Sequence, residues 1–205
     1  HLVIRQLRAD DVPSAQALMA DTWSNLLKRQ TGLDLSYPVR QATWYTSRLR
    51  YEPQGCVCIE EGGKLIATGF ALSCGNVGWI GPMEVSPAHQ GKGYGSQLLL
   101  SLETYLSTRG CKAVGLETMK DISRNLDFYT RAGYTLEQDM LFLEKDWLEG
   151  QDAGRPTSGN VDLKEIRRLA STINPGFDPS SEFKTYHEMG IGRTLQGGGA
   201  AALLL

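Results

Sequence analysis

The sequence has no long apolar run, few cysteines and no block of like charge. Its apolar runs fall well short of the ~20 residues that a membrane-spanning helix requires. No charged and then apolar signal segment opens the chain, so we expect a cytoplasmic protein with no membrane partner. The formal net charge is only −2, without a run of like charges, which argues against a nucleic-acid partner. Small partners are therefore expected.

The cysteines are too few for a disulfide framework and lack the C-x-x-C spacing of zinc sites. Three of the four, Cys56, Cys58 and Cys74, fall in apolar segments that resemble strands, whereas Cys111 does not. We therefore predict buried free thiols and no metal site. A metal-binding or redox role is the alternative.

The length allows one domain with an appendage. A chain of 205 residues with 41% hydrophobic residues can bury a full core. We expect a first domain at 1–148 and a linker at 149–160, which is rich in Gly, Pro, Ser and Asp. The extension at 161–205 holds a short helix candidate at 162–172, followed by an irregular, glycine-rich tail. It cannot close a domain alone, so it packs on the first domain or on a partner chain, or the sequence is cut short.

The order of elements predicts an α/β (α+β) fold. The patterns indicate strands at 2–8, 55–61, 65–74, 77–85, 112–118 and 134–147, and helices at 9–30, 38–50, 93–108 and 123–132. Hairpins and crossover helices together give a mixed sheet. Gly81 and Pro82 interrupt one strand, and because proline donates no hydrogen bond, we expect a bulge or a splayed strand there.

Three glycines at alternate positions, Gly91, Gly93 and Gly95, precede a predicted helix. The loop fits neither a Walker A motif nor the dinucleotide fingerprint, whose third glycine would fall on Ser96. A helix N-terminus with an uncrowded backbone can bind an anion such as a diphosphate. A simple tight turn is the alternative. Lys92 either adds charge at the rim or is a solvated surface residue.

Two motifs carry a resemblance to a known family. Gln90-x-x-Gly93-x-Gly95 resembles the acyl-CoA pyrophosphate motif of the GNAT (Gcn5-related) acyltransferase superfamily, and "GPMEVSP" is similar to its bulged fourth strand. "NLDFYTRAGY" resembles a later motif of the same family. The resemblance covers residues 2 to 148 and implies a mostly antiparallel sheet flanked by helices, with the fourth and fifth strands splayed apart. "GFDPSSEFKTYHEMGIGRTL" is similar to part of a degenerate second copy.

This resemblance implies an enzyme that transfers an acetyl group from acetyl-CoA to a primary amine by direct attack in a ternary complex, without a metal. Main-chain groups along the interrupted strand would bind the pantetheine arm, and the loop would hold the pyrophosphate. The implied cofactor-binding residues are Met83, Glu84, Val85, Gln90, Gly91, Lys92, Gly93, Tyr94, Gly95, Ser96, Asn125 and Tyr129. Tyr129 would protonate the leaving sulfur; the alternatives are a core aromatic for Tyr129 and a polar residue near a helix start for Asn125.

Glu84 and Glu117 are the candidate general bases. Strand alternation places Glu84 on the face opposite Met83 and Val85. Each carboxylate has a solvated surface role as its alternative, and ordered water can also remove the proton.

The amine acceptor, a small molecule or a peptide, is expected where the first two helices cover the sheet. Trp23, Tyr37, Trp44 and Tyr45 make that cover aromatic, and core packing is their alternative role. A non-catalytic acyl-CoA sensor or assembly module is the alternative function. A homodimer is the candidate assembly.

Overall fold

The computed structural model describes residues 2–137, 162–190, 193–197 and 200–204. The strands are β1 (Leu2–Gln6), β2 (Cys56–Glu61), β3 (Lys64–Cys74), β4 (Val77–Val85), β5 (Ala113–Leu116), β6 (Arg193–Gly197) and β7 (Ala200–Leu204). The α-helices are α1 (Val12–Thr31), α2 (Ala42–Tyr51), α3 (Tyr94–Thr108), α4 (Ser123–Arg131), α5 (Leu163–Ile173) and α6 (Ser180–Met189). Short 3-10 turns are η1 (Ala9–Asp11), η2 (Pro53–Gly55) and η3 (Pro87–His89). The predicted linker and most of the strand predicted at 134–147 lie outside the described residues.

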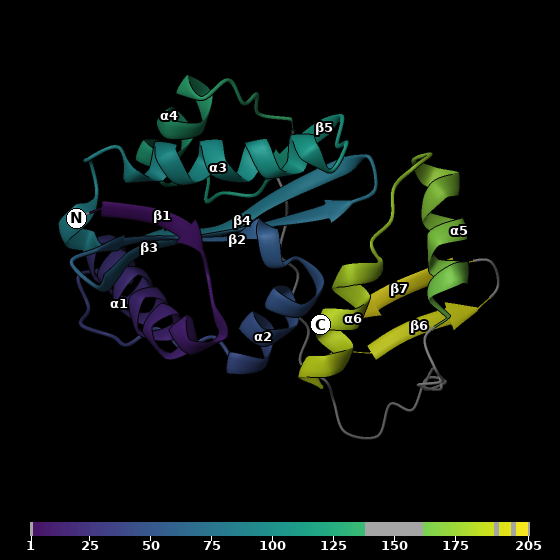
Figure 1. Ribbon diagram of the computed structural model, residues 1–205, viewed down its shortest axis with the longest axis horizontal. Helices are drawn as coiled ribbons and strands as arrows, with labels where there is room; N and C mark the ends of the chain where they lie inside the picture. The colour runs from purple at the N-terminus through teal and green to yellow at the C-terminus, as the bar shows by residue number, and fades with distance from the viewer. Residues whose placement is uncertain (1, 138–161, 191–192, 198–199, 205) are drawn as a thin grey trace.

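A five-stranded sheet forms the centre of the fold. Its strand order is β1-β2-β3-β4-β5; the first four strands are antiparallel, and β5 runs parallel to β4. Helices α3 and α4 cover one face, and α1 and α2 cover the other (Figure 1). The predicted fold class, a mixed and mostly antiparallel sheet flanked by helices, is confirmed.

Strands β4 and β5 separate halfway along β4. Their pairing runs from Val77 to Ile80, and within the part of the chain that the structure describes the rest of β4 pairs only with β3. At the separation point Gly81 and Pro82 stand opposite the single residue Phe70 of β3, which makes a bulge. Gly81 has φ +142°, a conformation that other residues rarely adopt. The predicted irregularity is therefore confirmed, and it opens the sheet beside residues 81–85.

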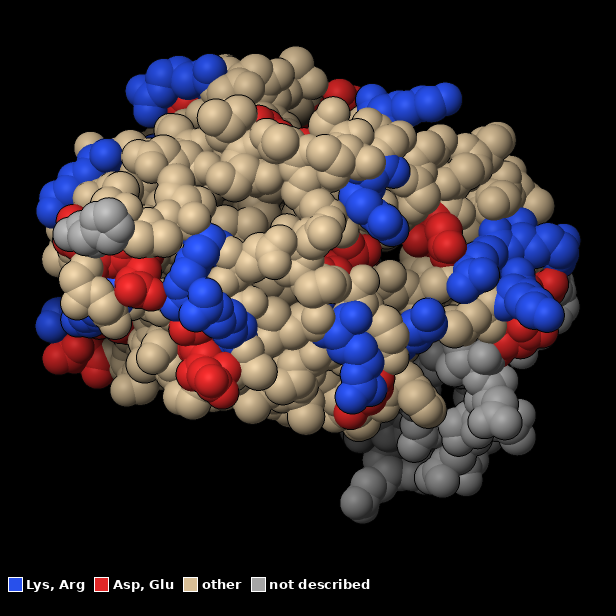
Figure 2. Space-filling model, in the orientation of Figure 1, with Lys and Arg blue, Asp and Glu red and all other residues tan. Residues whose placement is uncertain are grey.

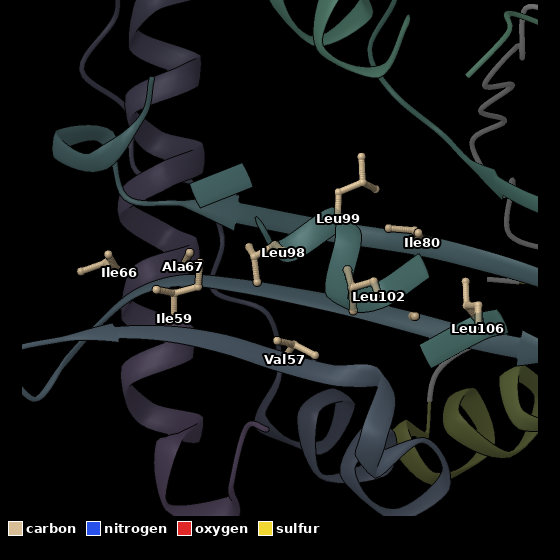
Figure 3. Close-up of a cluster of buried hydrophobic side chains, with 10 residues drawn as sticks. Val57, Ile59, Ile66, Ala67, Ile80, Leu98, Leu99, Leu102 and Leu106 are labelled. Atoms are coloured by element: carbon tan, nitrogen blue, oxygen red, sulfur yellow. The ribbon is translucent and has the colours of Figure 1, made fainter. Parts of the chain in front are cut away.

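Apolar side chains form one cluster on each face of the sheet. Under α3, leucines at helical spacing pack on β2, β3 and β4 (Figure 3). The buried members of this cluster are Val57, Ile59, Ile66, Ala67, Ala71, Ile80, Leu98, Leu99, Leu102 and Leu106. The second cluster lies under α1 and α2: Leu7, Val12, Ala15, Trp44, Tyr45, Cys56, Cys58, Leu65 and Phe70. The two clusters hold both helical layers against the strands that carry the candidate site.

The C-terminal segment has more structure than the sequence suggested. The helix predicted at 162–172 is confirmed as α5, whose first N–H groups bond to the carboxylate of Asp162. The prediction of an irregular tail is wrong, because α6 and the antiparallel β6–β7 hairpin follow α5. The sequence analysis interpreted the glycines of this segment as loop residues. Gly190, with φ +65°, is instead the residue that ends α6.

This segment packs on the first domain. Phe177 makes a β-bridge with Gly75, in the turn between β3 and β4, and Asn76 bonds to the main chain of Pro175 and Gly176. A Cβ atom at Gly75 would lie 1.9 Å from the Gly176 carbonyl oxygen, so this contact requires glycine. Helix α6 also lies against α2. Of the two packing alternatives, docking on the first domain is therefore observed.

The surface carries mixed charge. Lys and Arg side chains lie among Asp and Glu over the face in Figure 2. None of the described helices combines the length and apolarity needed to cross a membrane. The four cysteines are free thiols, and Cys56, Cys58 and Cys74 are buried, as predicted. A cytoplasmic location stays a prediction.

Candidate active site

The glycine loop connects η3 to α3. Gly91 has φ +79° and Gly93 has φ +84°, and a Cβ atom at either position would meet no other atom within 4 Å. These two glycines are therefore set by backbone conformation and not by crowding. Successive N–H groups in such a loop form a concave site for an anion.

The first turn of α3 leaves its donors free. Within the described residues, no acceptor bonds to the N–H groups of Tyr94, Gly95 and Ser96. These donors lie at the positive end of α3. Gly95 has ordinary helical backbone, and an added Cβ would lie 3.5 Å from Phe128, an ordinary contact. The fold does not itself require glycine there, so the bare backbone fits close approach by a diphosphate.

The side chain of Gln90 connects this loop to β4 and α1 by hydrogen bonds. Its Nε2 donates to the carbonyl oxygen of Val85 over 2.9 Å, and its Oε1 accepts from Arg29 of α1 over 3.4 Å. Lys92 is exposed. The Gln90 side chain therefore fixes the loop to the end of β4, and the loop's main chain remains available to a ligand.

The side chains of β4 alternate between the two faces, as predicted. Met83 and Val85 pack on the cluster under α3, together with Tyr129 of α4. Glu84 points to the opposite face, where it meets residues from α1 and from the segment before α2. The structure therefore places Met83, Val85 and Tyr129 against the same apolar cluster and Glu84 on the opposite face of the sheet.

The solvated role considered for Glu84 is wrong, because the residue is 1% exposed. Its Oε1 accepts from Arg40 Nη2 over 2.8 Å and from Trp23 Nε1 over 3.2 Å, and its Oε2 accepts from Thr68 Oγ1 over 3.0 Å. These donors compensate the burial of the charge. They come from three separate segments, so no local sequence pattern could have indicated them.

Arg40 is the site residue that the sequence analysis missed. Burial lowers the pKa of its guanidinium, but the nearby charge of Glu84 and the hydroxyl of Tyr45 outweigh this effect and raise the pKa overall. The group is therefore cationic, and it forms a buried ion pair with Glu84. Its sequence signal was its position between Tyr37 and the aromatic pair Trp44 and Tyr45.

Glu117 follows β5 and is exposed. The structure thus separates the two candidate bases by environment: Glu117 is solvated, and Glu84 is buried and paired. Both general-base assignments stay predictions.

Asn125 and Tyr129 lie one turn apart on α4. The Tyr129 ring meets Phe128 and Tyr134 edge-on, with centroid distances of 4.9 and 5.9 Å. Burial raises the pKa of the Tyr129 hydroxyl. A phenol with a raised pKa stays protonated at neutral pH, which suits a proton donor.

The four aromatic residues expected over the acceptor face divide into two pairs. Trp44 and Tyr45 are buried and pack edge-on against Phe70, so their core role is confirmed. Trp23 and Tyr37 are stacked, with centroids 5.4 Å apart, and both remain partly exposed. The exposed wall beside Glu84 is therefore Trp23 and Tyr37.

The described part of the chain contains no group of three or more His, Cys, Asp or Glu residues that could hold a metal ion.

Comparisons with known proteins agree with this geometry. An acetyltransferase of Sodalis glossinidius (strain morsitans) is 25% identical over 105 residues, which are 51% of this chain and 74% of that protein. A Pyrococcus horikoshii structure assigned as an acetyltransferase matches with a TM-score of 0.69 and 15% identity, over 98% of this chain and 67% of its own. AAC(6')-Iy, solved with the bisubstrate analogue CoA-S-monomethyl-acetylneamine, matches with a TM-score of 0.55 and 14% identity, over 72% of this chain and 99% of its own.

At such identities the two structures support the fold alone. The family assignment comes from the sequence: the model of the Acetyltransferase (GNAT) family matches residues 18–134, more than half of the chain. The chain therefore belongs to the acetyltransferase (GNAT) family.

Proposed function

We propose that this acetyl-CoA-dependent N-acetyltransferase transfers the acetyl group to a primary amine by direct attack in a ternary complex. The observation that carries the proposal is the arrangement of three features on the α3 side of the sheet: the N–H groups at the start of α3, which have no acceptor among the described residues, the part of β4 at Met83 and Val85 that does not pair with β5, and the Tyr129 phenol. The complex of AAC(6')-Iy with a CoA-containing analogue supports the choice of cofactor.

Main-chain groups do most of the cofactor binding in this proposal. Residues 90–96 hold the pyrophosphate through unpaired N–H groups, and Lys92 adds charge at the rim. Met83, Glu84 and Val85 offer main-chain groups to the pantetheine arm, because β4 has no β5 partner there. A main-chain N–H of this stretch polarises the thioester carbonyl. Asn125 contacts the arm from α4.

Two proton transfers complete the reaction. As the amine nitrogen forms its bond to the acetyl carbon and the carbon–sulfur bond breaks, Tyr129 protonates the leaving sulfur. Glu84 is proposed as the base that receives the proton of the amine. Since its carboxylate already accepts three hydrogen bonds, this step requires a bridging water or the displacement of Arg40.

The test measures release of free thiol from acetyl-CoA across a panel of primary amines, with CoA binding followed separately by calorimetry. We expect turnover with at least one amine and a loss of about tenfold or more in kcat for Tyr129→Phe, given the usual contribution of a general acid. Tyr134→Phe is the matched control: it removes a neighbouring hydroxyl, which bonds to Glu103 over 2.8 Å, and should retain kcat.

A non-catalytic acyl-CoA sensor is the competing function. It predicts tight CoA binding without thiol release on any amine. The absence of measurable CoA binding by folded protein would overturn both functions.

The domain division and the assembly are part of the proposal. Residues 1–148 form the catalytic domain, 149–160 are a linker, and 161–205 are an extension that docks on it. A homodimer is the proposed assembly, which light scattering of the full chain tests directly.

A further inference from the structure

Two arginines lie over the ring of one buried tryptophan. The guanidinium carbon of Arg40 is 4.8 Å from the centroid of Trp44, and that of Arg48 is 5.1 Å away. Trp44 is itself fixed edge-on between Tyr45 and Phe70, at 5.2 and 4.8 Å. Because like charges that share one ring repel each other, this arrangement requires a separate anion for each cation.

The two anions come from distant parts of the chain. Arg40 pairs with Glu84 of β4, and the Nη2 atom of Arg48 pairs with Glu182 of α6. The Arg48 side chain is only 9% exposed, and its Nε has no partner among the described residues. Glu182 is therefore the ion-pair partner of this buried cation among the described residues.

These contacts form a continuous path from Glu182 through Arg48, Trp44 and Arg40 to Glu84. Glu182 lies outside residues 18–134, which the family model matches. The segment that contains it therefore lies outside the matched part of the domain, and the path connects it to Glu84 through Arg48, Trp44 and Arg40.

We infer that Glu182 and Arg48 are positioning residues, which hold Trp44 and, through it, hold Arg40 on Glu84. The contacts among these side chains are observed whatever reaction the protein catalyses. Their effect on the amine acceptor rests on the proposed function of Glu84 as the base. Without the charge of Glu182, Arg48 is a buried cation that lacks its compensating anion. It then moves relative to Trp44, and the Arg40 guanidinium on the same ring changes its bond to Glu84.

Trp23 reports on this bond. Its indole N–H and the Nη2 of Arg40 donate to the same atom, Oε1 of Glu84. When the Arg40 bond weakens, the Trp23 bond strengthens, and the indole proton resonance moves downfield. The signal is one of four tryptophan indole signals and is assigned with Trp23→Phe.

The experiment records indole N–H NMR spectra of the full chain without ligand. We expect Glu182→Gln to move the Trp23 signal downfield, in the direction produced by Arg40→Gln. In the Arg40→Gln background, Glu182→Gln should add no further shift, because the path is already broken. Glu182→Asp, which keeps the charge, should return the signal towards the wild-type position.

The matched control is Glu165→Gln in α5. It removes the same charge from an exposed pair with Arg168 in the same C-terminal segment, and should leave the Trp23 signal unchanged. If Glu182→Gln does not fold, Arg48→Lys tests the same path, since it keeps the charge but loses the planar group over Trp44.

An unmoved Trp23 signal in the folded variants, or additive shifts in the double variant, would overturn the inference and leave Glu182 as a local stabilising contact. The proposed function fails separately, in the thiol-release and CoA-binding measurements on the wild-type chain.

Discussion

Breaking the Arg40–Glu84 pair should have unequal effects on stability, depending on which partner is removed. The side chain of Glu84 has no accessible surface, and that of Arg40 is 16% accessible. Arg40→Gln leaves a buried carboxylate with two remaining donors, Thr68 and Trp23. Removing one partner of a buried pair costs about 3–5 kcal/mol, and these donors should keep the loss near 3 kcal/mol.

Glu84→Gln should cost less, about 2 kcal/mol. Arg40 can still donate to the Tyr45 hydroxyl over 3.0 Å and lie over the Trp44 ring, and it retains some access to water. The double variant removes both charges, so we expect it to be about 1 kcal/mol more stable than Arg40→Gln alone.

Urea unfolding followed by tryptophan fluorescence measures these differences. With a slope of about 2–3 kcal/mol per M, a loss of 3 kcal/mol lowers the midpoint by roughly 1–1.5 M. Comparison of the wild type, the two single variants and the double variant yields the interaction energy between Arg40 and Glu84 directly. If the losses of the single variants simply add in the double variant, the two side chains are not coupled and the buried ion pair does not exist in solution.

Three further predictions concern the loop, the acid and the thiols. Gly95→Ala should fold normally but weaken acetyl-CoA binding about tenfold in calorimetry, an effect of about 1.4 kcal/mol, because the methyl group enters the space assigned to the diphosphate; an unchanged Kd contradicts this. Since burial raises the pKa of Tyr129, kcat should fall with rising pH only above the ordinary titration range of a tyrosine; a fall that begins below that range and disappears in Tyr129→Phe would contradict the raised pKa. Burial raises the pKa of the Cys56 thiol to about 12 and that of Cys58 to about 11. Both pKa values exceed the value of ~8.5 that a thiol has in the unfolded chain. The contribution of these thiols to the free energy of unfolding is therefore complete below pH ~8.5 and is lost as pH rises towards their pKa values in the folded state. Urea midpoints should therefore fall between pH ~8.5 and ~10.5, less steeply in Cys58→Ala, and a flat profile would contradict the burial of these thiols.

Local patterns predicted the parts of the site that depend on the backbone. The glycine loop, the helix that follows it and the interrupted strand at Gly81 and Pro82 each have a cause within a few residues: a required φ, an apolar stripe, or a missing N–H. Alternation along β4 also placed Glu84 correctly across from Met83 and Val85.

The environment of Glu84 could not be obtained in this way. A glutamate between apolar neighbours is as compatible with a solvated edge as with a buried pair. Its partners Trp23, Arg40 and Thr68 are 61, 44 and 16 residues away, and only the docking of α1 and the segment before α2 on the sheet brings them to it.

The sequence by itself determined where glycines leave the backbone without side chains, where side chains alternate between the two faces of a strand, and where helices begin, because these properties depend on neighbouring residues. Tertiary structure alone decided which charges are buried and what neutralises them. The pairing of Arg48 with Glu182 of α6 illustrates the difference: the desolvation of a charge is set by all the elements that pack around it, and those elements are distant in the chain.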